Sequence, residues 1–287
     1  MVKKRNWATL YLLLPSLGMT VLFVLVPVVM AVIFSFLELV NYRFTPNFTL
    51  ENWIDVFSGG AAGVTIGTMI KTLGVVGLVI GLVIAGAYPV AYLLAWRIKS
   101  QVTQTVILVL CILPYWTSYI IRMITWVPLL AEHGLVNMIL MKLGIIDQPI
   151  TTLLFSFKAM ILVEFFLWIV FMIGPIFWFI ARIPSEVMEA SLNLGATRLK
   201  RFLTITLPLS VPGIATGILF IFIMIMSDFA TPRIIGGGHI FFFASYVYSN
   251  MSFSEYAAAS VYSVLLMGVV LAIVYLLFRL VDLRKEL

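Results

Sequence analysis

Six long apolar runs, separated by segments that hold nearly all of the charged residues, organise this chain. A membrane-spanning helix needs ~20 consecutive, mostly apolar residues, and each run is long enough. Strands of a membrane barrel would instead be short and alternate between apolar and polar positions. The pattern therefore predicts an all-α membrane protein with six transmembrane helices. The runs are residues 6–37, 72–96, 100–121, 159–181, 202–227 and 256–278, free of charge except for Glu164 in the fourth.

Composition supports a membrane location and argues against one class of partner, nucleic acid. Of the 287 residues, 63% are hydrophobic and 10% are charged, whereas a soluble domain carries roughly a quarter charged residues. The net charge of +6 fits positive charges that anchor cytoplasmic loops, so we do not expect a nucleic-acid partner. The single cysteine, Cys111, lies inside an apolar run and has no neighbours for a disulfide or a metal site.

The distribution of Lys and Arg predicts how the chain crosses the bilayer. If the N-terminus is cytoplasmic, the cytoplasmic segments hold 12 of the 18 basic residues. This bias follows the positive-inside rule and places both termini in the cytoplasm. The first apolar run is too long for the core of a cleavable signal peptide, so we expect it to remain as a helix.

The connections between the runs show no linker that would separate two domains. The outer connections are expected at residues 38–70, 132–157 and 228–255, the first of them Gly-rich around residues 58–63. We therefore expect one transmembrane domain over residues 1–287, with its core at about 68–280.

The cytoplasmic segment between the fourth and fifth runs, residues 183–208, predicts two short helices that meet at a corner. Ser185 can cap the first helix, and Glu186 is favourable in its first turn. Gly195 is placed where a helix ends in a left-handed residue, a conformation that glycine adopts without a Cβ clash. Thr197 can start the second helix, and Pro208 is expected to end the unit before the next span.

This segment resembles the coupling loop of ABC importer permeases, the membrane subunits of ATP-driven import systems. In that family Glu-Ala-Ala is followed after three residues by Gly, then after nine by Ile, one further residue and Leu-Pro. The chain departs from this pattern only in a small-for-small exchange at Ser191. The positions that match or adjoin the pattern, which the resemblance assigns to coupling, are Glu186, Glu189, Ala190, Ser191, Gly195, Ala196, Arg198, Leu207 and Pro208.

The resemblance implies a type I importer permease fold in the bacterial inner membrane and a set of protein partners. These are a dimeric ATPase, a second permease subunit (a different chain, we expect) and an extracytoplasmic solute-binding protein. The sequence has no phosphate-binding Gly-x-x-x-x-Gly-Lys-Ser/Thr motif, so ATP is expected on a separate chain. We also expect no cofactor, metal or catalytic residue in this chain. The alternative for residues 183–208 is a basic amphipathic loop that lies on lipid headgroups.

Three further segments resemble permeases of the spermidine/putrescine type. They are Ala87–Tyr92, Leu113–Arg122 and Asp228–Gly237, so that the similar region extends from about Lys71 to Leu280. The resemblance implies a polyamine-like or related amino compound as cargo. Similar motifs occur in permeases for opines, aminophosphonates or ferric iron, and the fourth run departs from the polyamine pattern around Glu164.

Charged groups inside a bilayer are costly and therefore mark candidate functional positions. A carboxylate pair of Glu164 and Asp228 suits a cargo that carries an ammonium group, and aromatic faces add cation–π contacts. Alternatively, Glu164 pairs with Lys158 or Arg122, and Asp228 caps a helix or pairs with Arg233. The candidates for the cargo path are Glu164, Asp228, Tyr115, Trp116, Tyr119 and Arg122.

Two other function classes fit the sequence less well. An ion-coupled secondary transporter would place charges at mid-membrane and usually carry an inverted repeat. A membrane-embedded enzyme would need acids and histidines that converge on one face, whereas the 12 acids and two histidines here are scattered.

Overall fold

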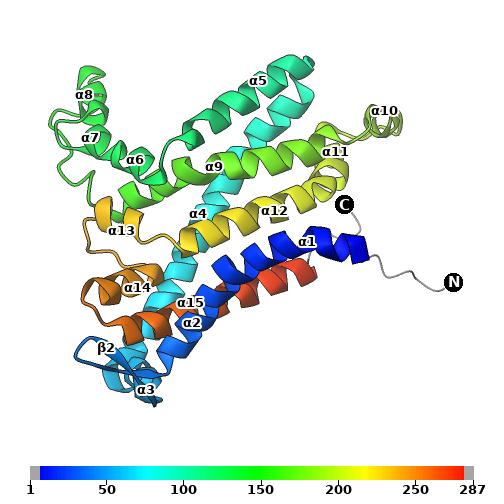
Figure 1. The fold of residues 1–287 in the computed structure, drawn as a ribbon. Coiled ribbons are helices and arrows are strands. Elements are labelled where there is room, and N and C mark those ends of the chain that lie inside the picture. Colours follow the sequence, from blue (N-terminus) through cyan, green and yellow to red (C-terminus); the bar gives the residue numbers. More distant parts are fainter. Residues whose placement is uncertain (1–6, 281–287) are drawn as a thin grey trace. The chain divides into compact units, whose positions relative to one another are not determined.

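The structure, a computed structural model, describes residues 7–280 and is helical over most of that range (Figure 1). The contacts within the chain divide it into two compact units. Unit 1 consists of the chain up to Ile66 together with Tyr246–Gly268, and unit 2 of Gly67–Ser245 together with the chain from Val269. Helices α4 and α15 each contribute to both units.

Unit 1 combines apolar helices with a small hairpin. The helix pair Trp7–Thr20 (α1) and Val26–Ser35 (α2) is joined by a π-helical turn, Val21–Leu25. The remaining elements are β1 (Leu37–Val40), β2 (Arg43–Phe48), α3 (Glu51–Phe57), the start of α4 (Gly59–Trp96), most of α14 (Phe243–Ser252) and the first half of α15 (Tyr256–Leu280).

The hairpin is an addition to the predicted all-helical chain. Strands β1 and β2 pair antiparallel around Asn41 and Tyr42, which both have positive φ angles, 47° and 61°. Two central residues with positive φ are the signature of the tight turn that matches the twist of a two-stranded hairpin. Asn52 attaches α3 to this region, because its side-chain amide donates to the carbonyls of Ser35 and Leu37.

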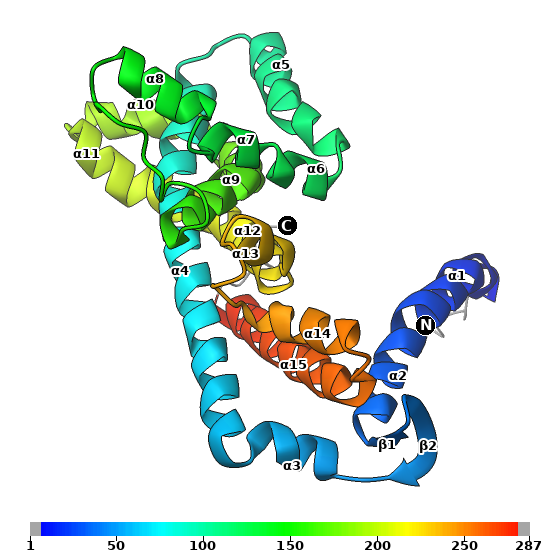
Figure 2. The same cartoon turned by 90° about the vertical axis from the view of Figure 1, so that its left-hand side faces the viewer.

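Unit 2 contains the rest of the long α4 helix, which runs for 38 residues (Figure 2), and the whole central part of the chain. Its other elements are α5 (Gln101–Ile112), a 3₁₀ turn (Leu113–Trp116), α6 (Tyr119–Ile124), α7 (Trp126–Leu130), α8 (Leu135–Lys142), α9 (Phe157–Ala181), α10 (Ser185–Asn193), α11 (Arg198–Arg201), a π turn (Phe202–Thr206), α12 (Leu207–Met226) and α13 (Ala230–Ile234).

Helices α9 and α12 lie side by side and form the core of unit 2 (Figure 1). They approach closely because glycines of α12 face α9. A Cβ atom at Gly213 would lie 2.7 Å from the carbonyl oxygen of Pro175, and one at Gly217 would lie 2.3 Å from Met172 Sδ. Small residues at a helix interface allow this approach, which favours packing between helices in membranes.

Within residues 7–280, six helical segments are long and apolar enough to cross a membrane, which agrees with the predicted number. One predicted boundary was wrong. The second helix begins at Gly59 rather than near residue 72, so residues 59–70 of the expected outer connection are helical. The fifth helical segment is continuous from Arg198 to Met226.

The third apolar run was predicted as one helix over residues 100–121, and the structure breaks it. Helix α5 and the 3₁₀ turn end at Trp116, and a new helix begins at Tyr119. Thr117 and Ser118 between them have extended ψ angles of 156° and 140°. Pro114 lacks a backbone N–H, which weakens the helix just before the break. The segment of spanning length here is therefore Tyr119–Lys142.

Both π turns have a proline two residues beyond their last residue. In the second, the Leu207 N–H donates to the Phe202 carbonyl, five residues back, and Pro208 follows. In the first, the Val26 N–H donates to the Val21 carbonyl, and Pro27 follows. A proline clashes with the carbonyl four residues before it, and a locally widened helix relieves that clash. Pro208 therefore does not end the helical unit, contrary to the prediction.

Candidate functional site

The corner between α10 and α11 has the predicted glycine-stabilised geometry. Gly195 has a φ of +72°, its N–H donates to the Leu192 carbonyl, and the Ala196 N–H donates to the Ser191 carbonyl. These two bonds form a Schellman motif, which satisfies carbonyls that the end of a helix leaves free. Thr197 then caps α11 by accepting from the Lys200 N–H at 3.3 Å. The corner is thus a defined turn between two helices.

One predicted cap at this corner was wrong. Pro184, not Ser185, occupies the N-cap position of α10, and the Pro184 side chain makes no capping hydrogen bond. Ser185 is instead the first residue of the helix, where Glu186 remains in the first turn as expected. Proline restricts the preceding backbone and cannot extend a helix backwards, so the boundary falls one residue earlier than the serine signal indicates.

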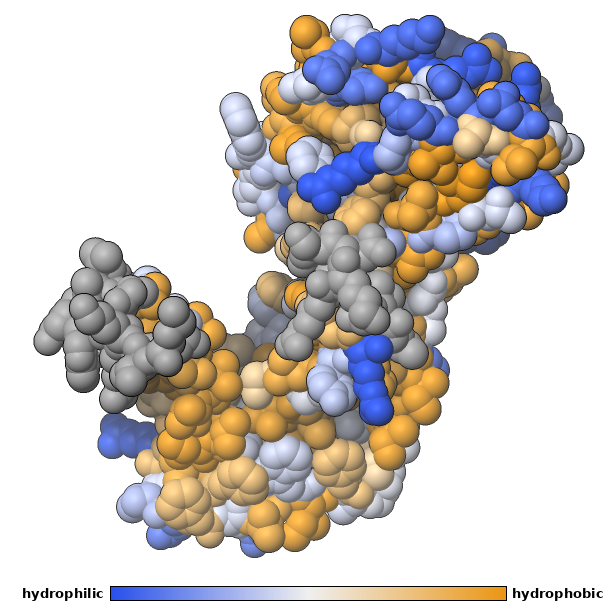
Figure 3. All heavy atoms as spheres, turned by 90° about the vertical axis from the view of Figure 1, so that its right-hand side faces the viewer, coloured by the Kyte–Doolittle hydropathy of each residue, from blue (hydrophilic) through white to orange (hydrophobic). Residues whose placement is uncertain are grey.

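The corner carries apolar side chains that are exposed rather than packed against the rest of the described chain. Leu194 is 87% exposed, Leu199 is 67% exposed, and Leu192 and Val187 are also exposed. Hydrophilic side chains gather at the end of unit 2 that carries α10 and α11 (Figure 3). Of the positions predicted to couple, Glu186, Glu189, Ala190, Gly195, Arg198 and Pro208 are exposed, Ala196 and Leu207 are half-buried, and Ser191 is buried.

Three of the predicted cargo-path residues form one cluster with two residues that were not predicted. The carboxyl of Glu164 on α9 is fully buried, and its Oε2 accepts from Trp168 Nε1–H at 2.6 Å. The Trp168 ring stacks on Tyr119 with centroids 5.5 Å apart. The Tyr119 hydroxyl donates to Asp228 Oδ2 at 2.5 Å and lies 2.6 Å from Thr231 Oγ1. The cluster therefore joins α6, α9 and the start of α13.

Asp228 satisfies the first N–H groups of α13 from the position before the N-cap residue Phe229, which agrees with the capping alternative for this residue. Its Oδ1 accepts from the backbone N–H groups of Ala230 and Thr231 at 2.8 and 3.2 Å. Asp is a preferred N-terminal capping residue because its carboxylate satisfies N–H groups that the helix leaves free. Thr231 follows Asp228 by three residues. This spacing could have indicated Thr231 as a further member of the cluster.

Arg122 and Tyr115 lie beside the cluster, whereas Trp116 does not join it. The Arg122 guanidinium carbon is 4.0 Å from the centre of the Tyr115 ring, within the range of a cation–π contact. The Tyr115 hydroxyl donates to the Leu167 carbonyl of α9. Trp116 is 85% exposed. Trp168 could have been predicted, because it follows Glu164 by four residues and so shares its helix face.

The expected ion pairs of Glu164 with Lys158 or Arg122 do not form. Glu164 Oε1 has no hydrogen-bond partner among the described residues, and neither do Nε and Nη1 of Arg122. Lys158 is exposed in the first turn of α9.

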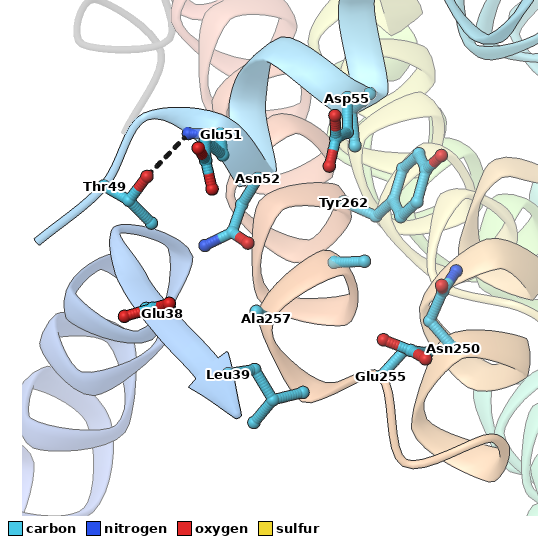
Figure 4. A pocket seen from close by; sticks show the side chains of 12 residues that line it. Glu38, Leu39, Thr49, Glu51, Asn52, Asp55, Asn250, Glu255, Ala257 and Tyr262 are labelled. Carbon is cyan, nitrogen blue, oxygen red and sulfur yellow. Dashed lines mark hydrogen bonds between the residues drawn. The ribbon is translucent and has the colours of Figure 1, made fainter. Parts of the chain in front are cut away.

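Unit 1 contains a separate acidic cleft of about 380 Å³ (Figure 4). Four carboxylates line it, from β1, α3 and the residue just before α15, and Asn52, Asn250 and Tyr262 lie among them. Glu38 accepts from Thr45 and Asn47 of the hairpin, which fixes one wall. The four acids are Glu38, Glu51, Asp55 and Glu255. The sequence did not indicate this cleft, because its walls come from opposite ends of the chain.

Comparison with known proteins identifies the family. The model of the family "Binding-protein-dependent transport system inner membrane component" matches residues 77–286. The chain belongs to this family. It is therefore a multi-pass inner-membrane permease subunit of an ABC importer rather than a catalytic subunit, and ATP binds to a separate ATPase. Membership also implies a solute-binding protein as a partner.

Individual relatives agree with this membership. The chain is 28% identical to the spermidine/putrescine transport system permease protein PotB of Escherichia coli, over 94% of this chain and 98% of PotB. It is 29% identical to the inner membrane ABC transporter permease protein YdcU of the same organism, over 75% of this chain and 68% of YdcU. A solved bacterial ABC transporter that imports alginate has the same fold, with a TM-score of 0.74, 19% identity and 96% coverage of both chains.

Proposed function

We propose that this permease imports a small polyamine-like or related amino compound, and that residues 183–208 couple its movement to the ATPase dimer. The exposed, rigid α10–α11 corner is the observation that carries the coupling assignment. Leu194 projects there with 87% exposure directly before the Schellman turn. Burial of such a side chain against a partner contributes roughly 1.5–3 kcal/mol. A rigid helix wedged between closing subunits can pass their movement to the spans.

The cargo class rests on the relatives and on the chemistry of the buried cluster. Several relatives, from Escherichia coli and Haemophilus influenzae among others, carry the name spermidine/putrescine permease. Glu164, Asp228, Tyr119 and Tyr115 bring carboxylates and aromatic rings together in unit 2, and an ammonium cargo is attracted by both. An opine, an aminophosphonate or ferric iron is the alternative cargo. We further propose that the chain works as one permease domain beside a second, different permease chain.

Deletion of Glu189–Gly195 tests the coupling assignment. The deletion removes the corner but no part of a span, so uptake by the assembled importer should be lost while membrane insertion stays normal. Leu194→Asp is the milder variant, and Leu143→Asp is its matched control because Leu143 is 67% exposed at the end of α8. Normal ATP-driven uptake by the deletion variant contradicts the assignment.

A further inference from the structure

The buried cluster and Arg122 beside it provide two groups of opposite charge that have atoms without a hydrogen-bond partner among the described residues. Glu164 is completely buried, and its Oε1 accepts no hydrogen bond among the described residues. On α6, Nε and Nη1 of Arg122 are buried and donate to nothing in the same part of the chain. A buried polar group without a partner destabilises the fold, and more strongly if it is charged. One such group alone would only destabilise the fold. An anionic and a cationic group together are complementary to a ligand that carries both a positive and a negative group.

The two carboxylates of the cluster differ in how many further hydrogen bonds they can accept. Asp228 accepts from Tyr119 on one oxygen and from two backbone N–H groups on the other. Glu164 accepts from Trp168 on Oε2, and its side chain also lies within hydrogen-bonding reach of the Asp228 carboxyl group. Asp228 also lies close enough to interact electrostatically with Glu164, so a positive charge placed at Glu164 would relieve the repulsion between them. Glu164 is therefore the position for a cation, and Asp228 has a positioning role.

Arg122 cannot supply that cation itself in this arrangement. Its guanidinium stacks over Tyr115, whose hydroxyl is bonded to the Leu167 carbonyl, so the aromatic ring holds it in place. Tyr119, which stacks on Trp168, precedes Arg122 by three residues on α6, less than one helical turn. The two unused groups thus lie on facing helices and are linked by the Tyr119–Trp168 stack. A guanidinium fork suits a carboxylate or a phosphonate, which it can bind through two hydrogen bonds.

We propose that Glu164 and Arg122 form the two ends of a cargo subsite for a compound that carries both an ammonium and an anionic group. Glu164 Oε1 accepts from the ammonium, and Nε and Nη1 of Arg122 donate to the anionic group. The inference rests on the proposed function and narrows its amino-compound class. A cargo with positive groups at both ends would leave Arg122 unpaired and bring a second cation towards it.

Three four-carbon probes test the subsite on the purified permease–ATPase complex without its binding protein, so that the binding protein does not select the ligand. They are γ-aminobutyrate (ammonium and carboxylate), putrescine (two ammonium groups) and butyrate (carboxylate only). Thermal unfolding of the complex, followed against millimolar probe concentrations, gives a dissociation constant for each. We expect γ-aminobutyrate to bind about tenfold more tightly than either of the other two, the difference expected for one additional charge-assisted hydrogen bond.

Variants with matched controls separate the two ends. Arg122→Gln should weaken γ-aminobutyrate binding about tenfold, to the level of putrescine, and Arg122→Lys should restore part of the loss. Glu164→Gln should weaken both ammonium probes. Lys158→Gln and Glu132→Gln remove a charge from exposed positions and should change nothing.

The outcomes distinguish this inference from the proposed function. Equal binding of putrescine and γ-aminobutyrate, or unchanged γ-aminobutyrate binding in Arg122→Gln, overturns the subsite while ATP-driven import of a polyamine still stands. Loss of coupling between the ATPase and the permease in the unmodified complex overturns both.

Discussion

Tyr119 is the residue that connects most parts of the buried cluster. Its hydroxyl contacts Asp228 and Thr231, and its ring stacks on Trp168, which holds Glu164. Because a carboxylate can only accept, the order of donation is fixed: Thr231 Oγ1–H donates to the Tyr119 oxygen, and Tyr119 donates to Asp228. One side chain thus orients both carboxylates.

Replacing Tyr119 by Phe should lower the free energy of unfolding by about 1.5–3 kcal/mol, because a buried carboxylate loses a hydrogen-bond donor. Denaturant unfolding of the purified protein in detergent micelles measures the change. Tyr275→Phe, at a position that is 65% exposed on α15, is the control and should be neutral. Equal stability of the two variants would show that the Tyr119 bond contributes nothing.

Gly195 is the other residue whose backbone decides a local structure. At a φ of +72°, with nothing within 4 Å of an added Cβ atom, a side chain there meets only backbone strain. Gly195→Ala should therefore cost about 1–2 kcal/mol at the corner. The expected result is a lower coupling ratio, measured as cargo imported per ATP hydrolysed, with normal amounts of protein in the membrane. An unchanged ratio would show that the corner need not be rigid.

At the scale of elements, the α9–α12 contact is the most sensitive to added volume. A Cβ atom at Gly213 would meet the backbone carbonyl of Pro175 at 2.7 Å, and a carbonyl cannot rotate away as a side chain can. Gly213→Ala should destabilise the protein by about 1–3 kcal/mol, the usual range for overpacking. Gly174→Ala on α9, where nothing lies within 4 Å, is the control. Thermal unfolding in detergent compares them, and similar melting temperatures would mean that the helices separate easily.

The elements show which features the sequence could predict. Charge-free runs predicted the number of spans and the place of five of them, because the cost of charges in lipid excludes charged residues from the membrane. The break at Thr117 and Ser118 could not be foreseen, because Pro114 is tolerated within apolar helices when neighbours satisfy the backbone. The helical start at Gly59 was missed because glycines signal loops, although the alanines that follow favour a helix.

At the scale of the whole molecule, residues far apart in the sequence meet in ways that no local pattern reports. Glu164 and Asp228 were predicted as candidates because each is an acid within or beside an apolar run. Their different roles depend on the partners Trp168, Tyr119 and Thr231, which folding brings together from α6, α9 and α13. The acidic cleft of unit 1 is a second case, since β1, α3 and α15 each supply part of its lining.

Contact between the α10–α11 corner and the ATPase is the central claim, and site-specific photo-crosslinking tests it most directly. A photoreactive amino acid replaces Leu194 in the assembled importer, and the same amino acid at Leu143 serves as the control. We predict that irradiation joins the permease to the ATPase from position 194 and not from position 143. Absence of an ATPase adduct at position 194, in an importer that still transports, would contradict the account.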